Sequence, residues 1–193
     1  NQLLETRVVE RTHELEAANQ RLELMSRTDG LLGIANRSYF DSRLQSEWKS
    51  AQFTGKPIAL VMMDVDFFKK YNDNYGHPEG DRCLALLGNC LRESLTRDNQ
   101  LVARYGGEEF ALILPESDIQ EALRLAQTII RNVFSLHIEH AFSPFGRVTV
   151  SVGISTARAV DIAGSQQNII IAADQALYQA KRGGRNRHAF VGV

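Results

Sequence analysis

The sequence has little net charge, only two cysteines and no long hydrophobic run. Its 22 basic and 23 acidic residues leave a formal charge of −1, so no overall field favours nucleic acid or an anionic membrane surface. No apolar stretch approaches the roughly 18 residues that a membrane-spanning helix needs, and no signal-peptide pattern opens the chain. We therefore expect neither a nucleic-acid partner nor direct membrane contact for this sequence.

The two cysteines, Cys83 and Cys90, lie seven residues apart in a segment with helical spacing of its leucines. Two helical turns separate them, which is too far for a disulfide. They are expected to be buried thiols in a reducing cytoplasm. Because the chain opens with Asn instead of Met, we also expect a missing upstream region. One alternative is that the chain is the cytoplasmic part of a larger, membrane-anchored sensor.

The first 27 residues contain neither glycine nor proline. Seven positions follow one another in steps of four and three: Leu4, Val8, Arg11, Leu15, Ala18, Leu22 and Met25. All but Arg11 are apolar, and a heptad stripe of this length predicts a coiled coil with a second copy of the chain. The alternative is an amphipathic helix packed on its own domain. We divide the chain into a coiled-coil helix over 1–27 and a folded domain over 28–193.

The rest of the chain alternates short apolar runs with amphipathic stretches. Strands are predicted at 58–63, 101–103 and 110–114, and helices at 38–54, 67–74, 82–97, 118–136 and 166–181. A turn is expected over 76–81, a second hairpin over 137–157 and an edge strand at 189–191. The order predicts an α+β fold with a five-stranded, mostly antiparallel central sheet flanked by helices.

The most distinctive segment is Arg104–Phe110, which places two glycines and two carboxylates between two apolar runs. The pattern predicts a hairpin with a Gly-Gly turn. Glycine accepts positive φ and has no Cβ, so backbone N–H groups of such a turn can approach a phosphate closely. Glu108 and Glu109 would be costly in a packed sheet unless they met a cation. The alternative is a solvated acidic hairpin without a ligand.

A second acidic position, Asp64, ends the strand at 58–63, where α/β folds tend to bind ligands. If the strands are neighbours, Asp64 and the two glutamates converge at one edge of the sheet. Carboxylates are ligands that Mg²⁺ prefers, and Mg²⁺ keeps positions open for substrate phosphates. Basic residues that would balance phosphate charge are Lys69, Lys181 and Arg185. The combination predicts a nucleotide phosphate site and leaves the reaction open.

Several ordered blocks resemble the GGDEF family of diguanylate cyclases, in its GGEEF form. The blocks are Asp64-Val65-Asp66-Phe67-Phe68-Lys69, Asn72-Asp73, Tyr75-Gly76-His77, Gly80-Asp81, Arg104 to Phe110, Ala180-Lys181 and Gly184-Arg185-Asn186. They cover about residues 28–191. The resemblance implies that two GTP molecules are condensed into cyclic di-GMP with release of two pyrophosphates, on a fold similar to the palm of nucleotidyl cyclases and polymerases.

The resemblance also implies the roles of individual residues. Mg²⁺, two ions per active site with Mn²⁺ as an alternative, would be bound by the Asp64 carboxylate, the Val65 carbonyl and Glu108. Lys69 would stabilise the pentavalent phosphorus. Either Glu108 or Glu109 would accept the proton of the attacking 3′-hydroxyl, and the sequence leaves this choice open. The phosphates would be bound by Phe67, Phe68, Gly106, Gly107, Lys181 and Arg185.

Guanine recognition would fall to Asp81, with Asn72 and His77 nearby. A carboxylate can accept both the N1–H and the N2–H₂ donors of guanine, whereas adenine would leave it unpaired. Asp81 can also be interpreted as the N-cap of a helix that begins at Arg82. The two roles are compatible, because one carboxylate has two oxygens.

Each active site of this family binds one GTP, so the resemblance implies a homodimer with facing sites. The predicted coiled coil would hold the two domains together and transmit a signal from an upstream sensor region. Many members carry Arg-x-x-Asp before the hairpin as an inhibitory product site. Here Arg97 is retained but Gln100 replaces the acid, so we expect weakened product inhibition at a degenerate site.

The main alternative function is a catalytically silent sensor module that binds GTP or cyclic di-GMP. Retention of both hairpin glycines and of Asp64, Glu108 and Glu109 disfavours it. A hybrid dinucleotide synthase or a mononucleotide cyclase is disfavoured by Asp81. A structural dimerisation module is disfavoured by the intact set of pocket residues.

Overall fold

The computed structural model describes residues 27–158 and 165–193. The elements are α2 (Arg37–Thr54), β1 (Ile58–Val65), α3 (Phe68–Tyr75), α4 (His77–Ser94), β2 (Leu101–Gly106), β3 (Glu109–Pro115), α5 (Ile119–Ser135), β4 (Val150–Ala157), α6 (Gln166–Arg182) and β5 (His188–Phe190). The predicted coiled-coil helix lies, apart from Arg27, outside the described residues. Within them, no helix is long and apolar enough to span a membrane.

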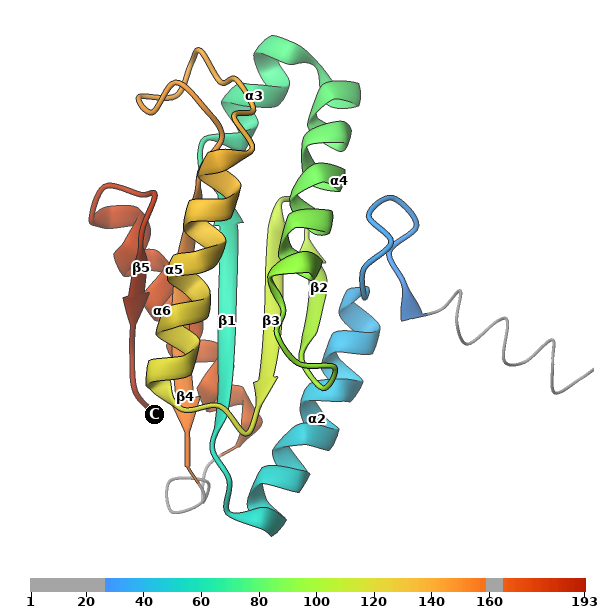
Figure 1. The fold of residues 1–193 in the computed structure, drawn as a ribbon, viewed down its shortest axis with the longest axis vertical. Coiled ribbons are helices and arrows are strands. Elements are labelled where there is room, and N and C mark those ends of the chain that lie inside the picture. Colours follow the sequence, from blue (N-terminus) through green and yellow to red (C-terminus); the bar gives the residue numbers. More distant parts are fainter. Residues whose placement is uncertain (1–26, 159–164) are drawn as a thin grey trace, which may run out of the picture.

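The strands form one sheet in the order β2-β3-β1-β4-β5 (Figure 1). Every neighbouring pair is antiparallel except β4 and β5, which are parallel. β1 lies in the centre, and its side chains are buried along almost the whole strand. This explains its continuous apolar run, because both faces of the strand are covered. The predicted α+β fold with a five-stranded, mostly antiparallel sheet is confirmed.

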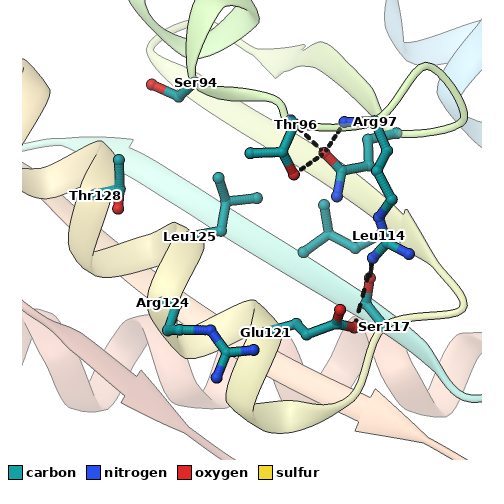
Figure 2. A pocket seen from close by; sticks show the side chains of 10 residues that line it. Ser94, Thr96, Arg97, Leu114, Ser117, Glu121, Arg124, Leu125 and Thr128 are labelled. Carbon is teal, nitrogen blue, oxygen red and sulfur yellow. Dashed lines mark hydrogen bonds and ion pairs between the residues drawn. The ribbon is translucent and has the colours of Figure 1, made fainter.

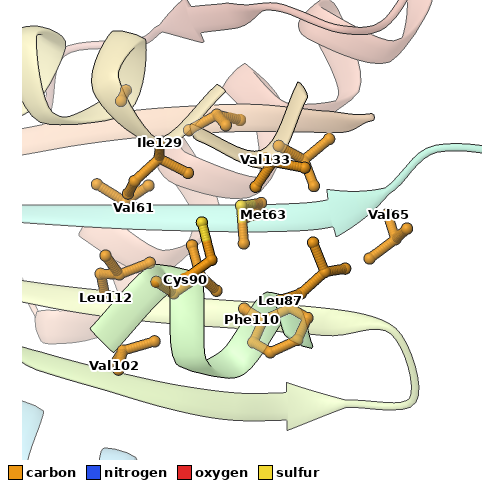
Figure 3. Close-up of a cluster of buried hydrophobic side chains, with 14 of the residues drawn as sticks. Val61, Met63, Val65, Leu87, Cys90, Val102, Phe110, Leu112, Ile129 and Val133 are labelled. Carbon is orange, nitrogen blue, oxygen red and sulfur yellow. The ribbon is translucent and has the colours of Figure 1, made fainter. Parts of the chain in front are cut away.

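Alternate side chains of β1 enter two separate cores, as the period of a strand requires. Val61 and Met63 contribute to the core under α4 and α5, where Leu87 and Ile129 meet them (Figure 3). The neighbouring residues Ile58, Leu60 and Met62 contribute to the core under α2 and α6. The strands are therefore fixed between two helical layers, and only their ends are open for a site.

The two cysteines lie in α4 and are free and buried, as predicted. Cys90 belongs to the core shown in Figure 3. Burial raises the pKa of the Cys83 thiol to about 12. Both thiols therefore act as packing groups and not as nucleophiles.

The predicted turn over 76–81 is wrong, because α4 begins at His77. Gly76 is the N-cap residue with φ 86°, and Pro78 lies in the first turn of the helix. Proline is compatible with that turn, since its missing N–H would have no helical partner there. Asp81 consequently lies inside the helix, and its interpretation as an N-cap is excluded.

The predicted hairpin over 137–157 is also wrong in its first arm. Residues 137–149 form turns with one isolated bridge, between Glu139 and Arg147. Both edges of β4 are already paired, one with β1 and the other with β5. The predicted edge strand is present as β5, and it occupies the place in the sheet that the arm would have needed.

Helix α6 packs unusually close to β4. A Cβ on Gly153 would lie 2.2 Å from the carbonyl oxygen of Ala173 and 2.2 Å from the backbone nitrogen of Leu177. No other residue type would fit, because both contacts are with backbone. The close packing fixes the end of α6, which carries Lys181, beside the end of β1.

Candidate active site

The acidic residues of β1 and of the hairpin meet at one end of the sheet, where β1 ends and β3 begins, as predicted. We call this end the Asp64 edge. Asp64 is the Cα partner of Glu109 in the β1–β3 ladder. The Val65 N–H donates to the carbonyl oxygen of Glu108 at 3.3 Å. The antiparallel register therefore brings carboxylates that are more than forty residues apart in the sequence to one place.

Asp64 lies at the centre of this group, with a side chain that is only 13% exposed. Burial raises the pKa of its carboxyl group, the ammonium of Lys181 lowers it, and Glu108 and Glu109 raise it further. Lys181 Nζ lies 2.8 Å from Asp64 Oδ2. Burial and then Glu109 also raise the pKa of Asp174 on α6, whereas Arg37 lowers it. Lys181 therefore contacts one of several neighbouring carboxylates, an arrangement that suits a divalent cation.

The tip of the hairpin consists of Gly107 and Glu108, between the end of β2 and the start of β3. The predicted hairpin is present, but neither Gly106 nor Gly107 adopts the positive φ that glycine permits. A Cβ on Gly107 would meet no atom within 4 Å, whereas one on Gly106 would lie 3.2 Å from Glu109 Oε2. The glycines thus keep the space around the tip free of side chains, which is the part of the prediction that the geometry supports.

Arg104 ties the hairpin tip to the segment that follows the N-terminal region. Its Nε donates to the carbonyl oxygen of Gly107 at 3.0 Å, and its Nη1 lies 3.2 Å from Asp29 Oδ2. The other carboxylate oxygen of Asp29 accepts from the N–H groups of Leu31 and Leu32. The loop after Thr28 and the hairpin are therefore mechanically connected.

A tight turn connects β1 to α3 at the place where backbone donors to phosphate were expected. Phe67 has φ 57°, a left-handed conformation that is unfavourable for a residue with a Cβ. It precedes α3 and gives the helix no side-chain cap, so the first N–H groups of the helix have no acceptor from the cap residue. The guanidinium of Arg185 lies 4.6 Å from the centre of the Phe67 ring. Phe67 and Arg185 are thus brought together, and Lys69 is exposed in the first turn of α3.

The predicted guanine-binding residues lie on α3 and α4. Asn72 is half-buried, and its Oδ1 is a buried acceptor without a hydrogen-bond partner in the described structure. A Cβ on Gly80 would lie 1.9 Å from this oxygen, so the glycine makes room for the amide. Asp81 and His77 are exposed on the same helix as Gly80. An unpaired amide and an exposed carboxylate therefore lie on adjoining elements.

Two buried polar residues near the site were not predicted. Asp66 is 2% exposed and accepts hydrogen bonds from three donors. His140 is 0% exposed, and its Nε2 lies 3.2 Å from the carbonyl oxygen of Phe67. In the sequence, Asp66 is part of the block that follows Asp64, but the block gives it no role of its own. Nothing in the sequence neighbourhood of His140 indicates its contact with Phe67.

Arg97 lies at the opposite end of the sheet, beside a pocket of about 340 Å³ (Figure 2). Its guanidinium contacts the Ser117 hydroxyl and lies 3.5 Å from Glu121 Oε2. Gln100 Oε1 accepts from the backbone N–H groups of Thr96 and Arg97 at 2.9 and 3.3 Å. Both residues of the degenerate motif are therefore engaged within the protein.

The chain belongs to the GGDEF family: residues 26–187 match the family model described as diguanylate cyclase, GGDEF domain. Among curated relatives, it is 39% identical over 168 residues to the response regulator PleD of Caulobacter vibrioides. It is 40% identical over 162 residues to the probable diguanylate cyclase DgcT of Escherichia coli. Each match covers 82% of this chain but only 35% and 34% of the relatives, so the chain spans about a third of their length.

Solved structures of the same family have the same fold. The coiled coil and GGDEF domain of DgcB from Caulobacter crescentus, in complex with c-di-GMP, superposes with a TM-score of 0.83 at 32% identity and covers 98% of this chain and 99% of that chain. The active GGEEF domain of a diguanylate cyclase from Vibrio cholerae has a TM-score of 0.71 at 29% identity, covering 81% and 97%. The palm-like fold expected from the sequence is thereby confirmed.

Proposed function

We propose that this chain is the catalytic part of a diguanylate cyclase, which condenses two GTP molecules into cyclic di-GMP and releases two pyrophosphates. The observation that carries the proposal is the meeting of Asp64 with the Glu108–Glu109 hairpin at one sheet edge, beside Lys181 and the Phe67 turn. In each half-reaction a 3′-oxygen would bond to the α-phosphorus of the other GTP, and the bond to pyrophosphate would break.

The residues present fit a divalent metal. Asp64, the Val65 carbonyl and Glu108 would hold Mg²⁺, two ions per site with Mn²⁺ as an alternative. The described residues contain no cluster of three or more His, Cys, Asp or Glu side chains suited to a metal, so substrate oxygens would complete the coordination. Bound metal would lower the pKa of the 3′-hydroxyl and stabilise charge on the α-phosphate and leaving group.

The protein's own groups would bind, orient and deprotonate the substrate. Lys181 would exchange its contact with Asp64 for a terminal phosphate, and Arg185 would bind another from its position over Phe67. The N–H groups at Phe67 and Phe68 and at the two hairpin glycines would donate to phosphate oxygens. Lys69 would stabilise charge on the pentavalent phosphorus. Glu108 and Glu109 both remain candidates for the proton acceptor.

Selection of guanine is assigned to Asp81, with Asn72 and His77 in the same pocket. The Asp81 carboxylate would accept two donors of guanine, and the unpaired amide of Asn72 would take a third contact. Because this carboxylate is exposed and does not cap α4, both of its oxygens are free for the base.

Formation of a cyclic product needs two such domains facing each other. We assign residues 1–27 to a coiled coil that joins them and residues 28–193 to the catalytic domain of a homodimer. An upstream sensor region would act through this helix, and the Arg104 link between Asp29 and Gly107 is a route to the hairpin. The domain would then act in the cytoplasm.

The Arg97 region is proposed to bind product weakly. Arg97 would have to leave Glu121 and Ser117, and Gln100 offers no negative charge to a guanine edge. Titration of the chain with cyclic di-GMP should give little inhibition, and Arg97→Ala should change it less than about threefold. Tight binding that Arg97→Ala abolishes would refute this part of the proposal.

The activity is tested by incubating the purified chain with GTP or ATP and Mg²⁺ and identifying the products by mass. Cyclic di-GMP from GTP alone is the expected result. Binding of GTP or cyclic di-GMP without turnover would support the silent sensor module instead. A hybrid dinucleotide or a cyclic mononucleotide would identify a cyclase of different product.

A further inference from the structure

Asp66 is the most deeply buried carboxylate near the site, and its hydrogen bonds all come from neutral donors. Oδ2 accepts from the Thr149 hydroxyl at 2.8 Å and from the Asn186 backbone N–H at 3.0 Å. Oδ1 accepts from the Ser151 hydroxyl at 2.7 Å. A buried carboxylate is costly unless it is hydrogen-bonded, and such bonds to a charged acceptor are strong. The site therefore retains Asp66 for a purpose that a neutral core residue would not serve.

These donors come from separate parts of the chain. Thr149 lies just before β4, Ser151 lies near the start of that strand, and Asn186 lies in the loop between α6 and β5. Asp66 itself connects the end of β1 to the Phe67 turn. One side chain thus joins the turn, the sheet and the loop that follows α6.

The loop after α6 needs such a support. Arg185 and Asn186 have φ values of 65° and 48°, and two successive non-glycine residues in the left-handed region are unfavourable. The Asn186 N–H bond to Asp66 holds the second of them. Arg185, one residue earlier, lies over the ring of Phe67, one residue after Asp66. Asp66 is therefore next to Phe67 in the chain and is hydrogen-bonded to the residue that follows Arg185, so it adjoins both partners of this cation–π contact.

We propose that Asp66 is a positioning residue that holds Arg185 over the Phe67 turn, and that it is not a metal ligand like Asp64. Both of its oxygens accept hydrogen bonds within the protein, and Asp66 is buried, whereas Asp64 is only partly buried. The functional consequence rests on the proposed function, in which Arg185 binds a terminal phosphate of GTP. The structural consequence, the placement of Arg185, does not depend on it.

The variants separate hydrogen bonding from charge. Asp66→Ala removes all three bonds. Asp66→Asn keeps an oxygen for Asn186 and Thr149, and its amide N–H₂ can donate to the Ser151 hydroxyl, which can accept. Ser155→Ala is the matched control, because Ser155 lies on the same strand and its buried hydroxyl has no hydrogen-bond partner in the described structure. If Asp66→Ala does not fold, the pair Thr149→Val and Ser151→Ala removes two of the donors instead.

The first measurement is the NMR signal of the Arg185 Nε–H, which the Phe67 ring should displace from its free value. This ring-induced change in chemical shift should be present in the parent chain and in Ser155→Ala, and it should be lost in Asp66→Ala. It should be reduced in the Thr149→Val/Ser151→Ala double variant and largely restored in Asp66→Asn. An unchanged displacement in a folded Asp66→Ala chain, or in the double variant where Asp66→Ala does not fold, would overturn the inference. This readout needs no GTP, so failure of the proposed function would not obscure it.

The second measurement is the KM for GTP in a double-mutant cycle with Arg185→Ala. Asp66→Ala should raise KM about tenfold with a smaller change in kcat, and Arg185→Ala should add little in that background. Fully additive effects would show that the two residues act independently and would contradict the inference. Absence of any turnover in the parent chain would instead refute the proposed function.

Discussion

The two ends of the central sheet differ in how their polar groups are paired. At the Asp64 edge, carboxylates outnumber the one lysine that contacts them, and Phe67 is strained. At the Arg97 end, the guanidinium has Ser117 and Glu121, and Gln100 caps its own loop. A pocket is present at this second end, yet its Arg97 and Gln100 side chains already have hydrogen-bond or ion-pair partners within the protein. Unbalanced charge and strain, more than the volume of a cavity, mark the end that is prepared for a ligand.

The largest expected effect tests the Asp64 edge itself. Asp64→Ala should lower the rate of cyclic di-GMP formation by about 1,000-fold or more, because it removes a proposed metal ligand and charge stabilisation by a bound metal is worth several kcal/mol. Initial rates at saturating GTP and Mg²⁺ measure this. Glu116→Ala, an exposed acid just beyond the other end of β3 that pairs with Lys56, is the control and should keep the parent rate. An equal loss of rate in Asp64→Ala and Glu116→Ala would contradict a specific catalytic role for Asp64.

The next effect concerns the choice of base. Asp81→Ala should reduce the preference for GTP over ATP by roughly 100-fold, since the variant lacks the carboxylate that we propose accepts the guanine donors. The ratio of kcat/KM for the two nucleotides is the measurement. Full retention of the GTP preference would exclude Asp81 from guanine recognition.

A smaller effect is expected at Gly80, where the packing of α4 leaves room for Asn72. Gly80→Ala should raise KM for GTP about tenfold, because the new Cβ would displace the Asn72 amide. The proposed hydrogen bond from Asn72 to guanine would then be lost. Gly88→Ala on the same helix is the matched control, since its Cβ would lie 3.5 Å from the nearest atom, Leu32 Cβ. If KM is unchanged in both Gly80→Ala and Gly88→Ala, Asn72 does not contribute to GTP binding.

The smallest effect is a pH dependence of stability at His140. Burial lowers the pKa of this imidazole; the hydrogen bond to Phe67 raises it, and the charge of Lys70 lowers it. The rings of Tyr71 and Tyr75 pack against it. A lowered folded pKa means that the unfolded chain binds a proton more readily, so stability is lost as the pH falls from 6.5 toward the folded value.

Denaturant unfolding of the parent chain between pH 7 and pH 5 should therefore show a loss of stability as the pH falls, and His140→Phe should lack it. The exposed His137 supplies the control substitution, His137→Gln, which should retain the loss. An identical pH slope in the parent chain and in His140→Phe would contradict the assignment.

The strand ends at Asp64 and Glu109 could be predicted, because the apolar run of β1 and the glycine hairpin are local patterns. Their meeting also needed β1 and β3 to be neighbours in the sheet, a long-range pairing that the structure shows. The start of α4 was missed because Gly76 and Pro78 were interpreted as a turn, although both are compatible with a helix N-terminus. At this position the local sequence is compatible with two structures, a turn and a helix N-terminus, and the sequence alone does not choose between them.

The support of the site could not be predicted, because it depends on tertiary neighbours. Asp66 meets Thr149 and Asn186 across more than eighty residues, and Gly80 meets Asn72 across a helix boundary. No spacing rule links such positions in a single sequence. The residues to which we assign the chemistry could therefore be proposed from the sequence, whereas the contacts around them became visible only in the structure.

The most direct test of the difference between the two ends is a crystal structure of the chain with a non-hydrolysable GTP analogue and Mg²⁺. We predict the triphosphate at the Asp64 edge, between the Phe67 turn and the hairpin, with guanine at Asp81 and no nucleotide beside Arg97. An analogue bound in the Arg97 pocket, with the Asp64 edge empty, would contradict the account.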